Sequence, residues 1–232
     1  MERVRVIDVG CGNLLSIIRI FEELDRDVKL IKSPDDICDG DIIILPGIGS
    51  YDKFIEGLKK YDFYDFLKCQ KNLSSIKLVG ICLGMQVLGD SSEEGFERGL
   101  GLIPGKVRKI PAGDRRVPNI GWHYVVNKKN HYSTQHFDEN ERFYFCHSFY
   151  FDCEKENILS TIEYNAEVAA AVTNLDGNVF GFQFHPEKSH KFGLKLMGAL
   201  LVSLKVTILN TRKTFDFLRQ FFRLHTKIDL YR

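Results

Sequence analysis

One cysteine of this sequence stands in a pattern that suits a nucleophile. Cys82 lies at the centre of Gly80-Ile81-Cys82-Leu83-Gly84, where an apolar run at 76–81 gives way to a helical pattern. A nucleophile between two glycines at a strand-to-helix turn forms a nucleophile elbow, because the turn is too tight for neighbouring Cβ atoms. The N–H groups that open the helix favour the thiolate. The pentapeptide alone also fits a buried structural cysteine in a glycine-flanked turn.

A histidine and a glutamate further along could supply the base that this thiol needs. They occur in Phe184-His185-Pro186-Glu187. Pro186 cannot donate to a strand ladder, so we expect the strand to end there and to leave His185 at the sheet edge. Glu187 can then turn back and orient the imidazole. A lone histidine at a strand end more often bonds a backbone carbonyl, so the predicted triad rests on the combination with Cys82.

Glycines after another apolar run could aim backbone N–H groups at the same place. In Pro46-Gly47-Ile48-Gly49, the N–H groups near Ile48 and Gly49 are candidates for an oxyanion hole shared with the N–H of Leu83. An ordinary glycine turn is the alternative. Gly10 and Gly12 also follow a strand pattern, but Leu15 stands where a dinucleotide fingerprint needs a third glycine, so we expect no such cofactor.

The elements that must position these residues alternate in the first half of the chain. Apolar runs typical of buried strands occur at 4–9, 28–31, 41–45 and 76–81, and helical periodicity occurs at 14–24, 50–67 and 83–88. This alternation predicts an α/β fold with a mainly parallel central sheet flanked by helices.

The second half predicts an added antiparallel part. Strand patterns occur at 142–147, 158–164, 168–173 and 179–184, with a hairpin turn at 174–178 and a closing helix at 189–204. We expect one domain at 1–204, followed by a basic amphipathic tail at 205–232 of unknown role. A helix packed on the domain surface and a contact with a partner or a membrane surface both fit the tail.

Composition excludes several classes of protein. The 232 residues are 44% hydrophobic and 27% charged, with a net charge of +1, which is typical of a soluble globular protein and not of a nucleic-acid binder. The six cysteines include no C-x-x-C pair, and Cys146-His147 with Cys153 is too sparse for a metal site, so we expect neither disulfides nor a metal.

The sequence also predicts a cytoplasmic location. The apolar segment after Met1-Glu2-Arg3 is too short for a signal peptide, and Lys195 and Lys205 interrupt the longest apolar stretch, so we expect no membrane span.

Together these motifs resemble those of the class I, triad-type glutamine amidotransferases. The superfamily signatures are Gly80-Ile-Cys82-Leu-Gly-Met-Gln86 and His185-Pro-Glu187. Over about residues 2–204 the sequence is similar, more closely, to the glutaminase subunits of imidazole glycerol phosphate synthase. The stretches that carry this closer similarity are 7–13, 45–49, 118–122, 146–148 and 181–189.

The resemblance implies a reaction that needs no metal or organic cofactor. Cys82 would attack the side-chain amide of glutamine, His185 would pass the thiol proton to the leaving ammonia, and Glu187 would orient His185. Water would then release glutamate from the thioester. Residues that match the family's glutamine pocket are Gly49, Gln86, Glu94, His147 and Ser148. Glu94 would accept the α-amino group, and the backbone at 147–148 would bind the α-carboxylate.

The family also implies a partner, a (β/α)₈-barrel cyclase that receives the ammonia along its axis in a heterodimer. Asn13 and Trp122, on segments peculiar to this family, are the candidates for contact with it. The local alternatives are that Asn13 caps a helix and that Trp122 is a half-buried core aromatic.

Several positions depart from the usual pattern. Phe149 stands where the family usually has Tyr, Asn119 where His is common, and His123 where Asn or a similar residue is usual; the tail has no counterpart.

These departures leave the triad intact but do not determine which compound accepts the ammonia. Histidine biosynthesis is expected, and ammonia supply for an acetamidino sugar of a surface polysaccharide is the alternative. A catalytically silent binding subunit is a third possibility, while the His-Pro-Glu placement disfavours a cysteine peptidase.

Overall fold

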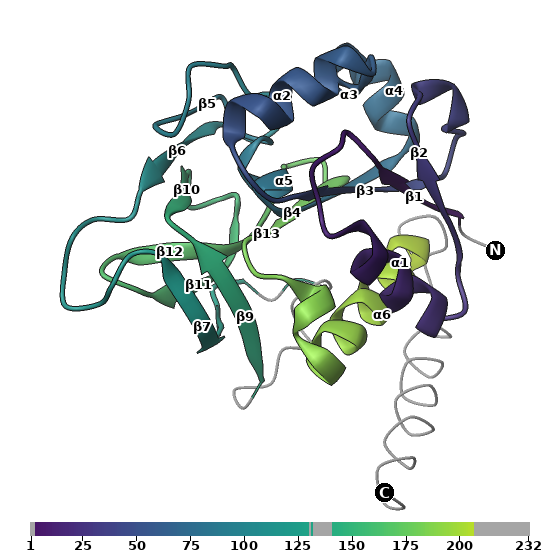
Figure 1. The fold of residues 1–232 in the computed structure, drawn as a ribbon. Helices are drawn as coiled ribbons and strands as arrows, with labels where there is room; N and C mark the ends of the chain where they lie inside the picture. The colour runs from purple at the N-terminus through teal and green to yellow at the C-terminus, as the bar shows by residue number, and fades with distance from the viewer. Residues whose placement is uncertain (1–2, 130, 132–140, 207–232) are drawn as a thin grey trace, which may run out of the picture.

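A mixed eight-stranded sheet forms the centre of the computed structural model (Figure 1). The structure describes residues 3–129, 131 and 141–206, so the predicted tail lies outside the described residues from 207 onward. The strand order is β2-β1-β3-β4-β13-β12-β11-β8. The strands β2, β1, β3, β4 and β13 run parallel, and β12, β11 and β8 each run antiparallel to the strand before it. This confirms the predicted fold class.

The bounds of the strands in this sheet are β1 Arg3–Ile7, β2 Asp27–Ile31, β3 Ile42–Gly47, β4 Lys77–Cys82, β8 Val126–Asn127, β11 Ile158–Glu163, β12 Glu167–Thr173 and β13 Val179–Phe182.

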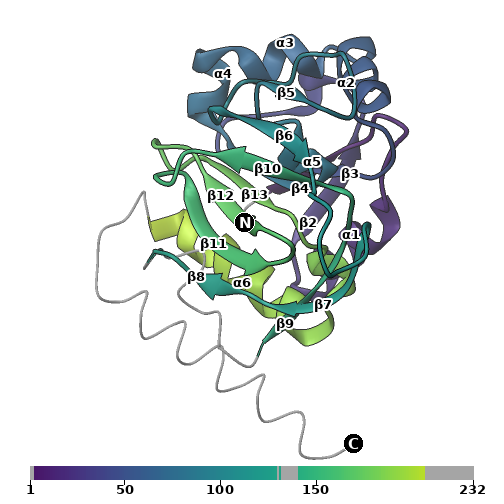
Figure 2. The same cartoon turned by 90° about the vertical axis from the view of Figure 1, so that its left-hand side faces the viewer.

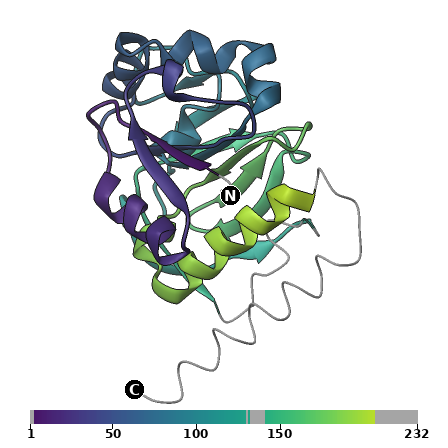
Figure 3. The same cartoon turned by 90° about the vertical axis from the view of Figure 1, so that its right-hand side faces the viewer.

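Helices cover both faces of the sheet (Figures 1 and 3). On one face lie α2 Tyr51–Lys60, α3 Phe63–Lys68 and α4 Gln70–Ser75, and on the other face α1 Leu14–Glu23 and α6 His190–Val206 lie side by side. The short helix α5 Leu83–Gln86 follows β4 directly, and the 3₁₀ helices are η1 Pro34–Asp36 and η2 Pro186–Lys188. Among the described residues, no helix combines the length and apolar character that a membrane crossing requires.

The strand β3 shows why its sequence is continuously apolar. Ile42 and Ile44 pack in one hydrophobic cluster, with residues of α1 and α6, while Ile43 and Leu45 pack in another, with residues of α2. Since successive side chains of a strand point to opposite faces, a strand covered by helices on both sides needs an apolar residue at every position.

Two smaller sheets lie beside the central one (Figure 2). One has the order β10-β6-β5, with bounds β5 Ser91–Ser92, β6 Gly105–Lys109 and β10 Phe149–Cys153. The other is the antiparallel pair β7 Asn119–Tyr124 and β9 Arg142–His147. The strand β9 has the bounds that the sequence predicts, whereas β5, β6, β7, β8 and β10 were not predicted.

One helix prediction was wrong. The pattern at 50–67 predicts a single helix, but the structure divides it into α2 and α3. Asp62, between them, has a φ of +62°, which no continuous right-handed helix can include. The chain bends there so that both Phe54 of α2 and Phe63 of α3 are buried.

The register of the parallel strands gathers the residues that the sequence singles out. Gly47 at the end of β3 lies opposite Cys82 at the end of β4. On the other side of β4, Phe182 at the end of β13 lies opposite Ile81. Because parallel strands end at the same edge of a sheet, the segments that follow β3, β4 and β13 meet at one place.

Candidate active site

Cys82 sits on a strained turn. It ends β4 with φ +54° and ψ −108°, and α5 begins at the next residue. A residue other than glycine rarely adopts this conformation, and strained backbone of this kind is concentrated at functional sites. The sequence therefore predicted the elbow correctly.

The two flanking glycines are needed because the backbone is packed against them. A Cβ at Gly84 would lie 1.7 Å from the carbonyl oxygen of Leu45 in β3, and a Cβ at Gly80 would lie 2.4 Å from the carbonyl oxygen of Gly84. No real Cβ makes such contacts, so only glycine lets α5 begin this close to the sheet.

His185 and Glu187 form a buried pair beside Cys82. His185 Nδ1 lies 2.8 Å from Glu187 Oε1, and the two side chains are 3% and 2% exposed. The backbone N–H of His185 donates to the carbonyl oxygen of Tyr144 in β9 at 2.8 Å, which fixes the end of the strand segment. Cys82 lies close enough to the imidazole to influence its pKa. The structure thus brings together the three residues of the predicted triad.

The surroundings of His185 favour its charged form. Burial lowers the pKa of His185, but hydrogen bonds and charge attraction from Cys82 and Glu187 outweigh it and raise the pKa to about 10. An imidazolium beside a sulfur atom favours the thiolate, which is the nucleophilic form of cysteine. The pair can therefore hold the thiol proton on His185 until a leaving group needs it.

Sequence reasoning missed Gln183. Its side chain is fully buried, and its Nε2 donates to Cys82 Sγ at 3.8 Å. The available signal was strand alternation, because Gln183 stands between two phenylalanines and two residues before His185, where its side chain would be on the same face as that of His185. A glutamine on the face that carries the base was a candidate for the same site.

The residues predicted to hold an oxyanion lie beside the elbow. Ile48 and Gly49 directly follow the end of β3, and Gly49 has a φ of +100°, which glycine adopts freely. Leu83 is the first residue of α5, so its N–H is among those that open the helix. Their role toward an oxyanion stays a prediction.

Two of the predicted glutamine-pocket residues are buried and contact the same carbonyl group. Gln86 Nε2 donates to the carbonyl oxygen of Phe149 at 2.9 Å and to Gln183 Oε1 at 3.0 Å. His147 Nδ1 lies 2.7 Å from the same carbonyl oxygen. Burial lowers the pKa of His147 to about 4, so its imidazole is neutral and Nδ1–H is the donor.

Of the other three pocket candidates, Gly49 is described above, and Glu94 and Ser148 are less buried than Gln86 and His147. Glu94 is an exposed residue, but partial desolvation of its carboxyl group raises its pKa. Ser148 is half-buried, and its carbonyl oxygen accepts from the N–H of Ile110 at 2.9 Å. The contacts of all the pocket candidates with glutamine stay predictions.

The two candidates for partner contact differ in exposure: Asn13 is half-buried and Trp122 is exposed. Asn13 occupies the N-cap position of α1, yet within the part of the chain that the structure describes its side chain makes no capping hydrogen bond. Trp122 is 38% exposed and stacks on His190 at a ring-centroid distance of 5.2 Å. Trp122 is therefore not a core aromatic.

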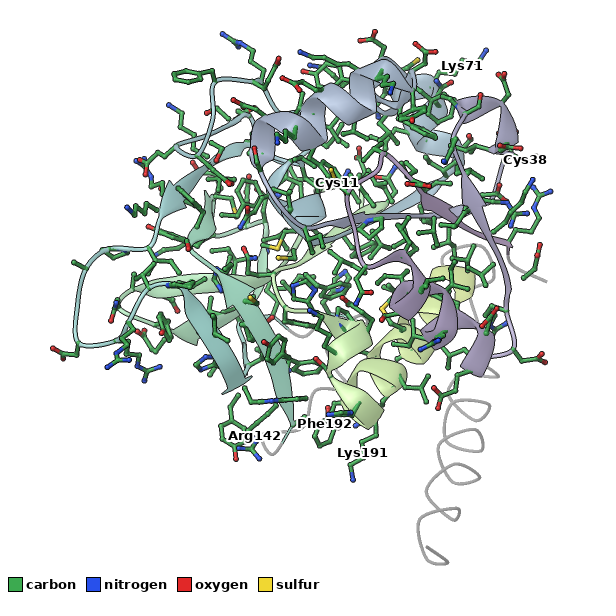
Figure 4. The ribbon with its side chains drawn as sticks, in the orientation of Figure 1. Cys11, Cys38, Lys71, Arg142, Lys191 and Phe192 are labelled. Atoms are coloured by element: carbon green, nitrogen blue, oxygen red, sulfur yellow. The ribbon has the colours of Figure 1, made fainter. Side chains whose placement is uncertain are left out.

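Trp122 also belongs to a groove with a cationic rim. The other residues that line it are Arg142, His190, Lys191 and Phe192. Figure 4 shows Arg142, Lys191 and Phe192 close together where β9 and α6 begin.

Comparison with known proteins agrees with this geometry. Residues 5–197 match the family described as glutamine amidotransferase class-I. Two solved structures with the same fold are PurLQS from Thermotoga maritima (TM-score 0.67, 21% identity, 88% of this chain and 99% of that one) and a glutamine amidotransferase from the same organism (TM-score 0.55, 20% identity, 94% and 90%).

The chain therefore belongs to the class I glutamine amidotransferases. Curated relatives indicate a more specific group of proteins within this family. The imidazole glycerol phosphate synthase subunit HisH 2 of Methanococcus maripaludis is 42% identical over 196 residues, covering 84% of this chain and 96% of that protein. The subunit of the same name from Pseudomonas aeruginosa is 41% identical over 193 residues, covering 82% and 95%.

The packing of the elbow predicts a large effect of one methyl group. Gly84→Ala should lower the free energy of unfolding by at least ~2 kcal/mol, because the new Cβ meets backbone that cannot move aside. Gly10→Ala is the control for backbone strain without a clash, since Gly10, unlike Gly84, has a positive φ (+82°) and no atom lies within 4 Å of the new Cβ. Its cost should be about 1 kcal/mol. If urea unfolding shows that Gly84→Ala and Gly10→Ala lose the same free energy of unfolding, the steric explanation is contradicted.

The histidine–glutamate pair predicts a pH dependence. Glu187→Gln removes a charge that favours the imidazolium, so the pKa of His185 should fall below about 10, measured by NMR titration of the ring. Because the folded-state pKa of His185 exceeds its ordinary value of 6.5, its contribution to stability is complete below pH 6.5 and is lost as pH rises toward 10.

Wild type should therefore lose more unfolding free energy over that pH range than Glu187→Gln does. Glu163→Gln, at an exposed position at the end of β11, serves as the control and should behave as wild type. A His185 that titrates identically with and without Glu187 would refute the role of this carboxylate.

Proposed function

We propose that this chain is the glutaminase subunit of an imidazole glycerol phosphate synthase, acting in histidine biosynthesis. The observation that carries the proposal is the buried arrangement of Cys82, His185 and Glu187 at the nucleophile elbow. Relatives named HisH at about 40% identity over nearly their whole length support the same function. The substrate is glutamine and the products are glutamate and ammonia.

The first half of the reaction forms a thioester. The Cys82 thiolate attacks the side-chain carbonyl carbon of glutamine, and the carbonyl oxygen becomes an oxyanion that the N–H groups of Leu83 and the 48–49 segment stabilise. His185 donates its proton to the amide nitrogen, the carbon–nitrogen bond breaks, and ammonia leaves. Glu187 keeps Nδ1 of His185 occupied, which directs Nε2 toward the reacting atoms.

The second half returns the enzyme to its starting state. Water attacks the thioester carbonyl and gives a proton to His185, and the carbon–sulfur bond breaks to release glutamate and the Cys82 thiolate. The glutamine itself is held by the pocket residues Gly49, Gln86, Glu94, His147 and Ser148, with Glu94 accepting its α-amino group. The domain that does this spans residues 1–204 in this proposal, and 205–232 form a tail, although α6 extends two residues past that boundary, to Val206.

The fate of ammonia requires a partner. In neutral water ammonia becomes protonated and loses its nucleophilic lone pair, so it must pass directly to an acceptor through a dry route. The partner is a (β/α)₈-barrel cyclase that forms a heterodimer with this chain in the cytoplasm. It would contact the exposed face that carries Trp122, together with Asn13 at the start of α1.

A second acceptor is favoured by one observation. Asn119 and His123, two of the positions that depart from the usual family pattern, lie on β7, the strand that also carries Trp122. Although Asn119 is buried and lies on the opposite face of β7 from Trp122, changes on this strand fit a variant barrel that uses ammonia to make an acetamidino sugar. The experiment below separates the two.

Glutamate release from glutamine should be slow for the purified chain alone and strongly stimulated by the cyclase with its ribonucleotide substrate, since such sites often become complete only on assembly. Formation of imidazole product would fix the acceptor. A reactive Cys82 without stimulation would instead direct the search to a sugar-pathway barrel. Vigorous hydrolysis by the chain alone would contradict the dependence on a partner.

Cys82→Ala should separate the two activities of the complex. Glutamate release should fall by more than about 10³-fold, because no other group forms the thioester. Synthesis supplied with ammonium salts should continue, since free ammonia bypasses the glutaminase. Loss of both activities in a complex that still assembles would rule out this division of roles.

A further inference from the structure

A continuous chain of hydrogen bonds joins β7 to the sulfur of Cys82. At its far end, His123 Nε2 lies 2.7 Å from Asn119 Oδ1. The amide of Asn119 then meets His147, with Nδ2 lying 3.0 Å from Nε2. At the other end, His147 donates to the carbonyl oxygen of Phe149, which also accepts from Gln86. Gln86 donates in addition to the side-chain oxygen of Gln183, and Gln183 donates to Cys82 Sγ.

The direction of each bond in this chain is fixed by chemistry. His147 is neutral and uses Nδ1–H as a donor, so its Nε2 can only accept, and the Asn119 amide nitrogen must point toward it. The Asn119 oxygen is thereby turned toward His123, which donates to it through Nε2. At the other end, the Gln86 amide nitrogen donates twice, which turns the Gln183 nitrogen toward Cys82 Sγ. Reversing one amide would break the pattern on both sides of it.

Burial makes these orientations costly to lose. Asn119 and Gln183 are 0% exposed, and Gln86 and His147 are 4% and 6% exposed. A buried polar group that loses its partner has no water to replace it, so a satisfied network holds its members in one arrangement. His123 is half-buried, and its ring meets the edges of Phe145 and Tyr164 at centroid distances of 5.5 and 5.4 Å.

We propose that Asn119 and His123 are positioning residues for Cys82, which hold His147 and, through the carbonyl group of Phe149, the Gln86–Gln183 pair that donates to the sulfur. The expected effect on catalysis rests on the proposed glutaminase function, whereas the positioning of Cys82 by these two residues does not. Neither residue touches the reacting atoms. Their effect is to keep the Gln183 N–H aimed at the sulfur and so to support the thiolate.

The residues at these two positions could exchange places, with the imidazole at position 119 and the amide at position 123. Either arrangement can keep a donor on His147. An imidazole at position 119 can donate to His147 Nε2 while accepting from an amide at position 123. The exchange of both residues keeps the total side-chain volume, whereas Asn119→His alone adds a ring at a fully buried position and His123→Asn alone shortens the side chain that reaches Asn119 Oδ1. We therefore expect the pair to be exchangeable as a unit but not singly.

The test therefore compares Asn119→His, His123→Asn and the double exchange in the full-length chain. The first readout is the rate at which iodoacetamide alkylates Cys82, followed by peptide mass spectrometry. The second is the kcat and KM of glutamine hydrolysis in the complex with the cyclase. Each single exchange should lower the alkylation rate severalfold and kcat by about tenfold, and the double exchange should restore both to within about twofold.

Asn157→Ala is the matched structural control. Asn157 is 2% exposed and donates to the carbonyl oxygen of Thr173 at 2.9 Å, outside the chain of bonds that leads to Cys82. It should lower the melting temperature without slowing the alkylation of Cys82. The proposal is overturned if the single exchanges behave like this control, or if the double exchange folds but restores neither rate. If wild-type complex hydrolyses no glutamine while the alkylation rates still differ as expected, the proposed function fails and the positioning role stands.

Discussion

The active site depends on how closely α5 approaches β3. The absence of a Cβ at Gly84 lets the start of α5 lie against the carbonyl oxygen of Leu45, and Gly47, at the end of β3, lies opposite Cys82. This approach holds Cys82 in its strained conformation, which the surrounding packing must enforce since isolated backbone would relax. Gly47 also leads directly into the 48–49 segment, so that segment begins beside the turn that carries Cys82.

Burial of charge at this edge is the second constraint. His185 and Glu187 are almost fully enclosed, and a buried charge is stable only when it is paired and hydrogen-bonded. The two side chains meet this need by pairing with each other, His185 Nδ1 with Glu187 Oε1 at 2.8 Å. The backbone of His185 is held separately, since its N–H donates to the carbonyl oxygen of Tyr144 in β9 and its carbonyl oxygen accepts from the Ser189 hydroxyl. The strand β9 is therefore part of the catalytic arrangement, although it lies outside the central sheet.

Sequence reasoning succeeded where local pattern and local geometry coincide. Cys82 and Gly84 are neighbours in sequence and in the turn that they form, and His185 and Glu187 are two residues apart, so spacing alone predicted them. It failed where a contact joins distant segments. Asp62 divides a helix because both Phe54 and Phe63 must be buried, which periodicity does not reveal. Gln183 looked like a strand residue because its partners, Gln86 and Cys82, are about a hundred positions away.

The two faces of β7 have different surroundings, because successive side chains of a strand point to opposite sides. The outward side chains, Ile120 and Trp122, are exposed, while the inward Asn119 is fully buried against His147. A register shift of one residue would bury the apolar row and expose the amide, so the pairing of Asn119 with His147 across β7 and β9 fixes both faces at once. The outward side chains that the proposed partner would contact and the inward side chains beside His147 therefore share one short strand. A substitution that disturbs the backbone of β7 would then alter both faces.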